Sequence, residues 1–245
     1  MKFLALKDGA DPEGTFIWLE GFDSSTRVDS SGNFELSIPP KQAQGGTNGI
    51  SGIFSIYYYI ANYELASSNI VTRNSEFVFL SGDLNDIGEL TPVTLQRNLR
   101  IHTKVIPDSV STDYTGFIDV EVSLLANNPV NVEFPFTFPD QLGAILACCD
   151  STNLVYTFKA FPNLLTSSII EVQDSLITKS LSFTLATIDL PAVEYEIIPY
   201  LFVNRDDIPS ELLLNLGDTV KALGREYLNM PLKRTGGSFE ITTVR

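Results

Sequence analysis

The run FIDVEVSLL, residues 117–125, alternates apolar and polar side chains over most of its length. Residues two apart in a β-strand point to the same face, so this period predicts a strand with one buried face. The runs FIWLEG (16–21), NFELSIP (33–39) and RIHTKVI (100–106) alternate in the same way or nearly so, and clusters of Gly, Pro, Asn, Asp and Ser separate them. Short strands between such turns are typical of β-sandwiches. We therefore expect an all-β protein.

Helical sequence is scarce and lies near the C-terminus. The best candidate spans about residues 209–215, with Pro209 in its first turn and Gly217 after its end, positions that favour a helix start and stop. We place a domain boundary near Arg97–Asn98, because one set of expected strands ends around Leu95 and RIHTKVI begins another. The expected architecture is two consecutive β-sandwich domains, residues 1–97 and 98–245, with short helical decoration near the C-terminus.

The N-terminal part resembles a known class of β-sandwich module. The stretches 14–21, 25–36 and 38–40 follow the order strand, Asp-containing turn, Gly-Asn-Phe, strand and proline exit. This order is similar to that of the carboxypeptidase-regulatory-like, or transthyretin-like (prealbumin-like), domains, although Val28 stands where a threonine is more usual. The resemblance implies a transthyretin-like sandwich in residues 1–97. It also implies an extracellular or cell-surface protein, whose signal peptide would have been removed or omitted from this chain.

The C-terminal part resembles a second family. The stretches 120–135, 153–156, 180–183 and 190–195 follow the order strand, Asn-rich turn, strand ending in Phe-Pro, and a late proline turn. This pattern is similar to that of the immunoglobulin-like sandwich of the intracellular proteinase inhibitor family. Tyr156 replaces the tryptophan of that family, and Val193 replaces the glycine of its Gly-x-Tyr turn. The resemblance implies an immunoglobulin-like domain in residues 98–245 and adds protease inhibition as an alternative function.

The charge of the chain excludes some classes of partner. Acidic residues outnumber basic ones, 30 to 16, and the formal net charge is −14. Such a field repels polyanions, so we expect no nucleic-acid partner. The sequence has no run of about 18 apolar residues, so we also expect no insertion into a membrane.

The residue types that usually carry catalysis form no constellation in this sequence. His102 is the single histidine, and no Gly-x-Ser-x-Gly nucleophile motif occurs. Cys148 and Cys149 are adjacent, and neighbouring strand positions point to opposite faces, which disfavours a disulfide between them. With one histidine they cannot complete a four-ligand metal site. We expect a protein that is not an enzyme and has no catalytic residues, no cofactor and no metal.

Two local alternatives stay open at this point. Asp23, Asp29 and Asn33 carry the oxygen atoms that calcium prefers, although a turn in which an Asp side chain bonds the backbone explains the same residues. Lys2 and Lys7 lie near the first expected strand, and some transthyretin-like modules form a lysine–asparagine cross-link there. An intact mass equal to that of the unmodified chain would exclude the cross-link.

The run SGIFSIYYYIANYEL, residues 51–65, holds four of the nine tyrosines. Read as one strand, it places Tyr58 on an apolar core face and Tyr57, Tyr59 and Tyr63 on the opposite face. Tyr57 and Tyr59 would then lie about 7 Å apart, a spacing that suits stacking on sugar rings or on another protein. The alternative is that these rings pack against cross-strand neighbours or the second domain. The three tyrosines are the candidate binding residues.

Two hypotheses of function follow from these patterns. The first is a structural or assembly protein of the cell exterior, a surface or filament component that binds other protein subunits, including copies of itself. Strand-rich ends such as SFEITTV (238–244) suit strand addition between chains. The alternative is a carbohydrate- or protein-binding module that uses Tyr57, Tyr59 and Tyr63.

Overall fold

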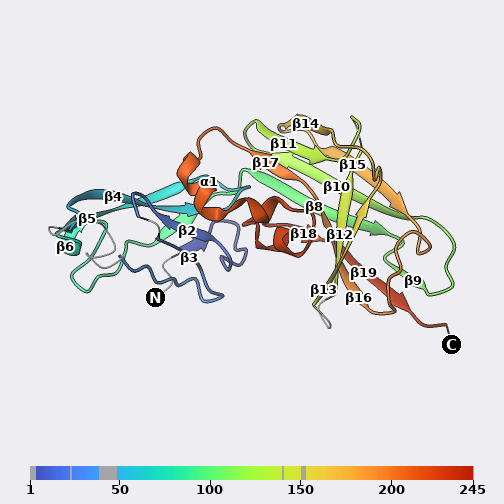
Figure 1. Cartoon of the computed structure of the whole chain (residues 1–245), viewed down its shortest axis with the longest axis horizontal. Coiled ribbons are helices and arrows are strands. Elements are labelled where there is room, and N and C mark those ends of the chain that lie inside the picture. Colours follow the sequence, from blue (N-terminus) through green and yellow to red (C-terminus); the bar gives the residue numbers. More distant parts are fainter. Residues whose placement is uncertain (1–3, 23, 39–48, 140, 150–152, 245) are drawn as a thin grey trace. The chain divides into compact units, whose positions relative to one another are not determined.

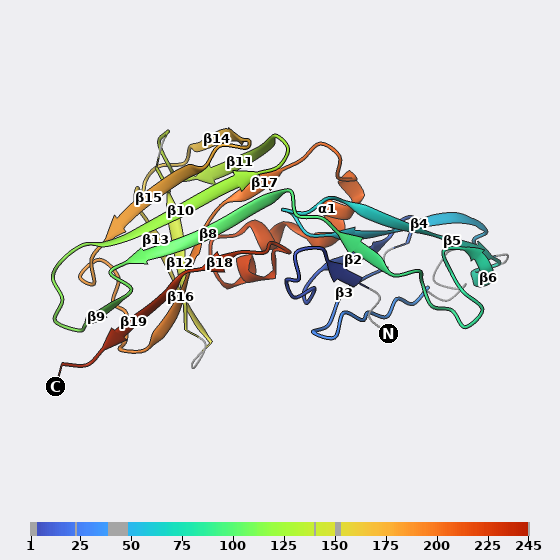
Figure 2. The same ribbon diagram turned by 180° about the vertical axis from the view of Figure 1, so that it is seen from behind.

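The computed structural model describes residues 4–22, 24–38, 49–139, 141–149 and 153–244, and it has the predicted all-β fold (Figure 1 and Figure 2). The chain forms two compact units. Unit 1 comprises residues 1–97 together with 206–220, and unit 2 comprises residues 98–205 together with 221–245. None of the helices in the described ranges is long and apolar enough to cross a membrane.

Unit 1 contains an antiparallel sheet of five strands, in the order β3-β2-β4-β5-β6, and a parallel pair formed by β1 and β7. Two residues with positive φ, Asn74 and Ser75, form the turn between β5 and β6. Asn is among the residues that tolerate this conformation best. The strands are β1 (Leu4–Leu6), β2 (Phe16–Leu19), β3 (Ser24–Arg27), β4 (Gly52–Tyr59), β5 (Ala66–Arg73), β6 (Glu76–Gly82) and β7 (Val93–Leu95).

One face of the five-stranded sheet forms the core of unit 1. Ile17 of β2 and Tyr58 of β4 are opposite each other in register, and both are buried together with Leu4 and Leu95 of the parallel pair. Burial of each such side chain contributes about 1.5–3 kcal/mol to folding. The period of two in the sequence therefore assigns these residues to the correct face.

The expected strand NFELSIP is wrong for the residues that the structure describes. Residues 33–38 form no strand, and Pro39 lies outside the described residues. Phe34, Leu36 and Ile38 nevertheless pack against the core as partly buried side chains. The alternation thus places the side chains correctly. The backbone lacks a partner strand, and without a ladder of hydrogen bonds it is not a strand.

Unit 2 contains three sheets, with the strand orders β15-β10-β8-β18, β14-β11-β17 and β13-β12-β16-β19-β9. The run FIDVEVSLL forms most of β10, where buried and half-buried residues alternate. The strands are β8 (Leu99–Ile106), β9 (Ser109–Ser111), β10 (Ile118–Ala126), β11 (Val130–Pro135), β12 (Ala144–Cys149), β13 (Leu154–Lys159), β14 (Ser167–Val172), β15 (Ile177–Phe183), β16 (Glu194–Pro199), β17 (Phe202–Asn204), β18 (Thr235–Gly236) and β19 (Ser238–Thr242).

Aromatic side chains join two of these sheets across the core of unit 2. The ring of Phe183 in β15 lies 6.0 Å from that of Phe158 in β13 and 6.3 Å from that of Phe239 in β19, measured between centroids. Aromatic rings attract one another at such separations. Phe183 and Phe239 are buried and Phe158 is half-buried, and two sheets whose inner faces meet through such rings fit a β-sandwich.

The α-helix α1 (Ser210–Leu216) lies where the sequence predicts it and ends at Gly217, which has a φ of +86°. The sequence groups this helix with the second domain, whereas in the structure its segment belongs to unit 1, where α1 packs against β2. Leu212 is fully buried. Isolated helices of this length are marginal in water, so packing of this kind must stabilise it. Two 3₁₀ segments follow, η2 (Asp218–Lys221) and η3 (Arg225–Asn229).

The run SFEITTV is not a free terminal strand. Its residues 238–242 form β19, which pairs with β16 on one side and with β9 on the other. Phe239 and Ile241 are buried. Both backbone edges of this strand are therefore used within the chain, so the strand is not available for donation to another subunit in this conformation.

Candidate functional site

The expected exposed face of three tyrosines does not form. Tyr57 is half-buried and stacks on Trp18 of β2, with ring centroids 5.6 Å apart and planes 21° apart. Tyr59 is buried. Tyr57 and Tyr59 do share the face opposite the core, as their spacing predicts. There they lie beside residues of the neighbouring strand β2, since Trp18 is opposite Tyr57 and Phe16 is opposite Tyr59 in register. Only Tyr57 among the three keeps part of its surface in water.

Tyr63 departs from the prediction for a different reason. The strand β4 ends at Tyr59, and the Tyr63 backbone N–H donates a hydrogen bond to the Ile60 carbonyl in the turn that follows. The alternation of faces holds only within a continuous strand. Tyr63 is consequently directed away from Tyr57 and Tyr59, and it is fully buried.

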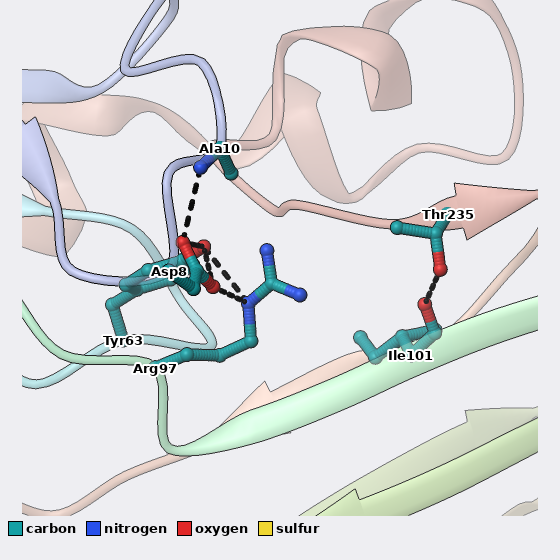
Figure 3. Close-up of polar contacts among 6 residues, drawn as sticks. All are labelled: Asp8, Ala10, Tyr63, Arg97, Ile101 and Thr235. Carbon is teal, nitrogen blue, oxygen red and sulfur yellow. Dashed lines mark hydrogen bonds and ion pairs between the residues drawn. The ribbon is translucent and has the colours of Figure 1, made fainter.

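Tyr63 belongs to a polar cluster with Asp8 and Arg97 (Figure 3). Its hydroxyl donates to Asp8 Oδ2 at 2.9 Å and accepts from Arg97 Nε at 2.8 Å. Arg97 Nε also lies 2.7 Å from Asp8 Oδ2 in an ion pair, and the guanidinium carbon lies 5.1 Å from the centroid of the Tyr63 ring. The backbone N–H of Ala10 donates to Asp8 Oδ1 at 3.2 Å. All these groups lie in unit 1.

This cluster is built to hold three chain segments together. Asp8 follows β1, Arg97 follows β7, and Tyr63 follows β4. Burial raises the pKa of Tyr63 to about 12, above its ordinary value of 10. The hydroxyl therefore keeps its proton at neutral pH and acts as a hydrogen-bonding group between a carboxylate and a guanidinium. We call Asp8, Tyr63 and Arg97 the tyrosine clamp.

The other residues singled out in the sequence occupy separate places. His102 Nδ1 lies 3.1 Å from Thr235 Oγ1 in unit 2, and the same Thr235 hydroxyl donates to the Ile101 carbonyl (Figure 3). Cys148 and Cys149 are both buried thiols in β12. Among the described residues, no group of three or more His, Cys, Asp or Glu side chains is placed to hold a metal ion.

The alternatives of a calcium site and a cross-link fall partly outside the described residues, because Asp23 and Lys2 lie there. Asp29 is described, and its Oδ1 accepts hydrogen bonds from the backbone N–H groups of Ser31 and Asn33, both at 2.9 Å. This is the side-chain-to-backbone turn that explains the same sequence without a metal. Lys7 donates to the side-chain oxygen of Gln96 at 2.9 Å.

A concave feature of unit 1 that could take a ligand is an apolar pocket of about 190 Å³. It lies on the core face of the sheet. Gly88 helps to form it, because its φ is +82° and a Cβ atom there would stand 3.0 Å from the Phe79 ring. The pocket is lined by Phe34, Glu35, Leu36, Ile56, Ile70, Phe77, Phe79, Leu84, Gly88, Glu89 and Leu90. We call it the β6 pocket, because Phe77 and Phe79 belong to that strand.

The surroundings of the β6 pocket are acidic. Glu35 and Glu89 are among its lining residues, and residues 74–96 contain four acidic side chains, one of which, Glu76, has Arg73 of β5 as its register partner. Glu89 is half-buried, and its Oε2 accepts a hydrogen bond from the Asn85 side chain at 3.3 Å. The pocket therefore combines apolar walls with two acidic side chains.

The strand β6 also has an open edge. It pairs with β5 on one side, and within the described part of the chain no strand pairs with its other side. Phe79 and Leu80 expose 52% and 78% of their surface. Leu80 has a φ of +57°, a conformation in which a bulky residue is strained. The strand pairs with β5 in regular register at Glu76 and Phe77, and the register shifts before Gly82, so β6 presents only a short regular edge.

No protein-family model matches the chain, and a search of curated proteins finds no significant match. The two family resemblances noted in the sequence therefore remain predictions.

Sequence reasoning overlooked both the tyrosine clamp and the β6 pocket. The clamp residues Asp8 and Tyr63 are 55 positions apart, and no local pattern connects them. A usable signal for the pocket was the run EFVFL, residues 76–80, where apolar residues occur on both faces of an expected strand. Such a strand must find cover on each face or leave one exposed.

Proposed function

We propose that this chain is a non-enzymatic structural or assembly protein of the cell exterior that acts by binding other protein subunits. The observation that carries the proposal is the open edge of β6 beside the β6 pocket. Open strand edges are used for strand addition between chains, where backbone hydrogen bonds supply affinity and adjacent pockets supply specificity.

Exposed apolar side chains in the same unit support a role in protein contacts. Ile53, Leu80 and Ile87 each expose more than two thirds of their surface, at 73%, 78% and 71%. Single exposed apolar residues are common on any protein. Here, however, Leu80 belongs to the open strand, and Ile87 belongs to the loop that contributes Gly88 and Glu89 to the pocket.

The cell exterior is proposed from the sequence resemblance to transthyretin-like modules, which are mostly exported. The alternative of a glycan-binding tyrosine face has lost its main support, because Tyr59 and Tyr63 are buried. Protein contacts through β6 are therefore the better-supported function.

The test uses the full chain in its native cells and in purified form. Native gel analysis of cell fractions should place the protein in the exterior fraction, in complexes larger than the 27.0 kDa monomer. A double variant, Leu80→Lys and Ile87→Lys, should no longer be found in these complexes. It should still fold, because both side chains are exposed and their replacement spares the core. Matched lysine substitutions at the exposed Leu165 and Leu176 of unit 2 should leave the complexes intact. A monomer in every fraction, or complexes indifferent to the β6 variant, would contradict the proposal.

A further inference from the structure

The length of the β6 edge limits the kind of partner that could bind there. This inference rests on the proposed function. The edge is short, because β6 pairs with β5 in regular register at Glu76 and Phe77, the register then shifts before Gly82, and Leu80 within the shifted stretch has a φ of +57°. An added strand finds only a few residues to pair with here, which suits a short extended segment better than a broad sheet.

The side chains of an added segment would alternate between the two faces of the sheet. Phe77 and Phe79 are two residues apart, point to the same face and line the β6 pocket. A strand paired with β6 places every second side chain on that face, beside the pocket wall. Apolar cavities of about 150 Å³ take a molecule the size of benzene, so the pocket, at about 190 Å³, has room for one leucine, methionine or phenylalanine side chain.

The carboxylates at the pocket favour basic residues on either side of the apolar side chain of the bound segment. Glu35 and Glu89 line the pocket, and the cation at the start of the edge, Arg73 of β5, is already the register partner of Glu76. A second copy of this chain brings a net charge of −14 and is repelled from such a surface at low salt. Lysine or arginine side chains two residues away from the apolar anchor would lie on the same face and compensate these carboxylates.

We propose that β6 and the β6 pocket form a receptor site for an extended segment of another protein, in which one apolar side chain is flanked by basic residues at the second position on either side. The segment pairs with Glu76–Phe79, and its apolar side chain occupies the pocket.

The test is a peptide titration followed by NMR of the isotope-labelled full chain. The probe is a blocked heptapeptide in which threonine alternates with lysine, leucine and lysine. We expect shift changes in residues 76–79 and 84–90, and binding about tenfold weaker when the central leucine becomes serine. Replacing both lysines by glutamates should abolish binding. Methylating the backbone nitrogens that face β6 should abolish it as well, because the ladder needs those donors.

Variants of the chain provide a second set of measurements. Glu89→Gln keeps the size of the side chain and removes its charge. It should weaken binding of the lysine peptide, whereas the affinity for a neutral peptide with glutamine in place of both lysines should not change. Leu36→Trp fills the pocket and should prevent binding, whereas Leu165→Trp, at an exposed position of unit 2, should not. Higher salt should weaken binding, since the attraction is electrostatic.

Each remaining outcome overturns the inference. These outcomes are absence of binding at millimolar peptide, equal binding of the lysine and glutamate peptides, and shift changes confined to other strands. Light scattering of the chain alone, with a mass that grows as salt is added, would identify a second copy as the occupant instead. If the peptides fail while the native complexes still depend on Leu80 and Ile87, the proposed function stands and this partner is wrong. If the complexes themselves are missing, the proposed function fails.

Discussion

Each of the two units contains a tyrosine with no exposed surface whose hydroxyl is fully used, but the partners differ. Tyr63 in unit 1 bonds two charged side chains, Asp8 and Arg97. Tyr227 in unit 2 bonds the backbone: it donates to the Leu201 carbonyl at 2.6 Å and accepts from the Leu201 N–H at 3.1 Å. One unit bonds its tyrosine hydroxyl to charged side chains, and the other bonds it to peptide groups.

This difference determines what happens when a hydroxyl is lost. Asp8 and Arg97 have 31% and 17% of their side-chain surface exposed, and they contact each other at 2.7 Å, so each keeps a partner without Tyr63. Leu201 is fully buried, so its peptide groups have no access to water. A buried peptide group without a partner costs about 1–3 kcal/mol. The neutral arrangement is therefore the more vulnerable one.

The largest effect is expected for Tyr227→Phe. The change removes the hydrogen-bond partner of both the N–H and the carbonyl of Leu201. We therefore expect the free energy of unfolding to fall by about 3 kcal/mol. Urea denaturation of wild type and variant at neutral pH measures it. Tyr114→Phe, which changes a half-buried tyrosine hydroxyl bonded to the Phe117 carbonyl, is the matched control. A loss below that of Tyr63→Phe would reverse the comparison.

Tyr63→Phe should cost less. The variant loses hydrogen bonds to two charged groups but leaves neither of them without a partner, so we expect a decrease of about 1.5 kcal/mol in the free energy of unfolding. The same denaturation experiment gives the value. A cost equal to that of Tyr227→Phe would mean that the ion pair does not hold its geometry without the hydroxyl.

The stability of wild type and Tyr63→Phe at alkaline pH provides a further comparison. Because burial raises the pKa of Tyr63 to about 12, the unfolded chain loses this proton near pH 10 while the folded chain keeps it until about pH 12. The stability that this group contributes is complete below pH 10 and decreases as pH rises, by about 1.4 kcal/mol per pH unit between these values. Tyr63→Phe should make the slope of unfolding free energy against pH shallower by that amount. Parallel slopes for variant and wild type would show that Tyr63 ionises with the same pKa in both states.

The smallest effect is expected for Asp8→Asn. The ion pair with Arg97 is partly exposed, and such pairs contribute about 0.5–1 kcal/mol. We expect a loss of that size at low salt and a smaller one at 1 M salt, since the charges are then screened over about 3 Å. A salt-independent loss would assign the effect to hydrogen bonds of the carboxylate instead of its charge.

Much of the fold was predictable because it depends on neighbouring residues. Alternation in residues 117–125 anticipated β10, and the Pro209 and Gly217 positions anticipated α1. The candidate site was less predictable. Tyr57 and Tyr59 do share a face, as two residues apart in a strand must. Their exposure depends on Trp18, which lies in another strand, and no local pattern reports which residues a strand will meet.

Sequence by itself determined the elements whose causes are local: the period of two in β8 and β10, the turn built by Asp29, and the short helix near the C-terminus. Tertiary structure alone decided that Tyr63 is buried between Asp8 and Arg97, that β19 lies inside a sheet, and that β6 keeps an open edge beside a pocket. The physical reason is separation along the chain. Backbone geometry sets the direction of a side chain within a few residues, whereas its burial depends on contacts with segments that the local sequence does not specify.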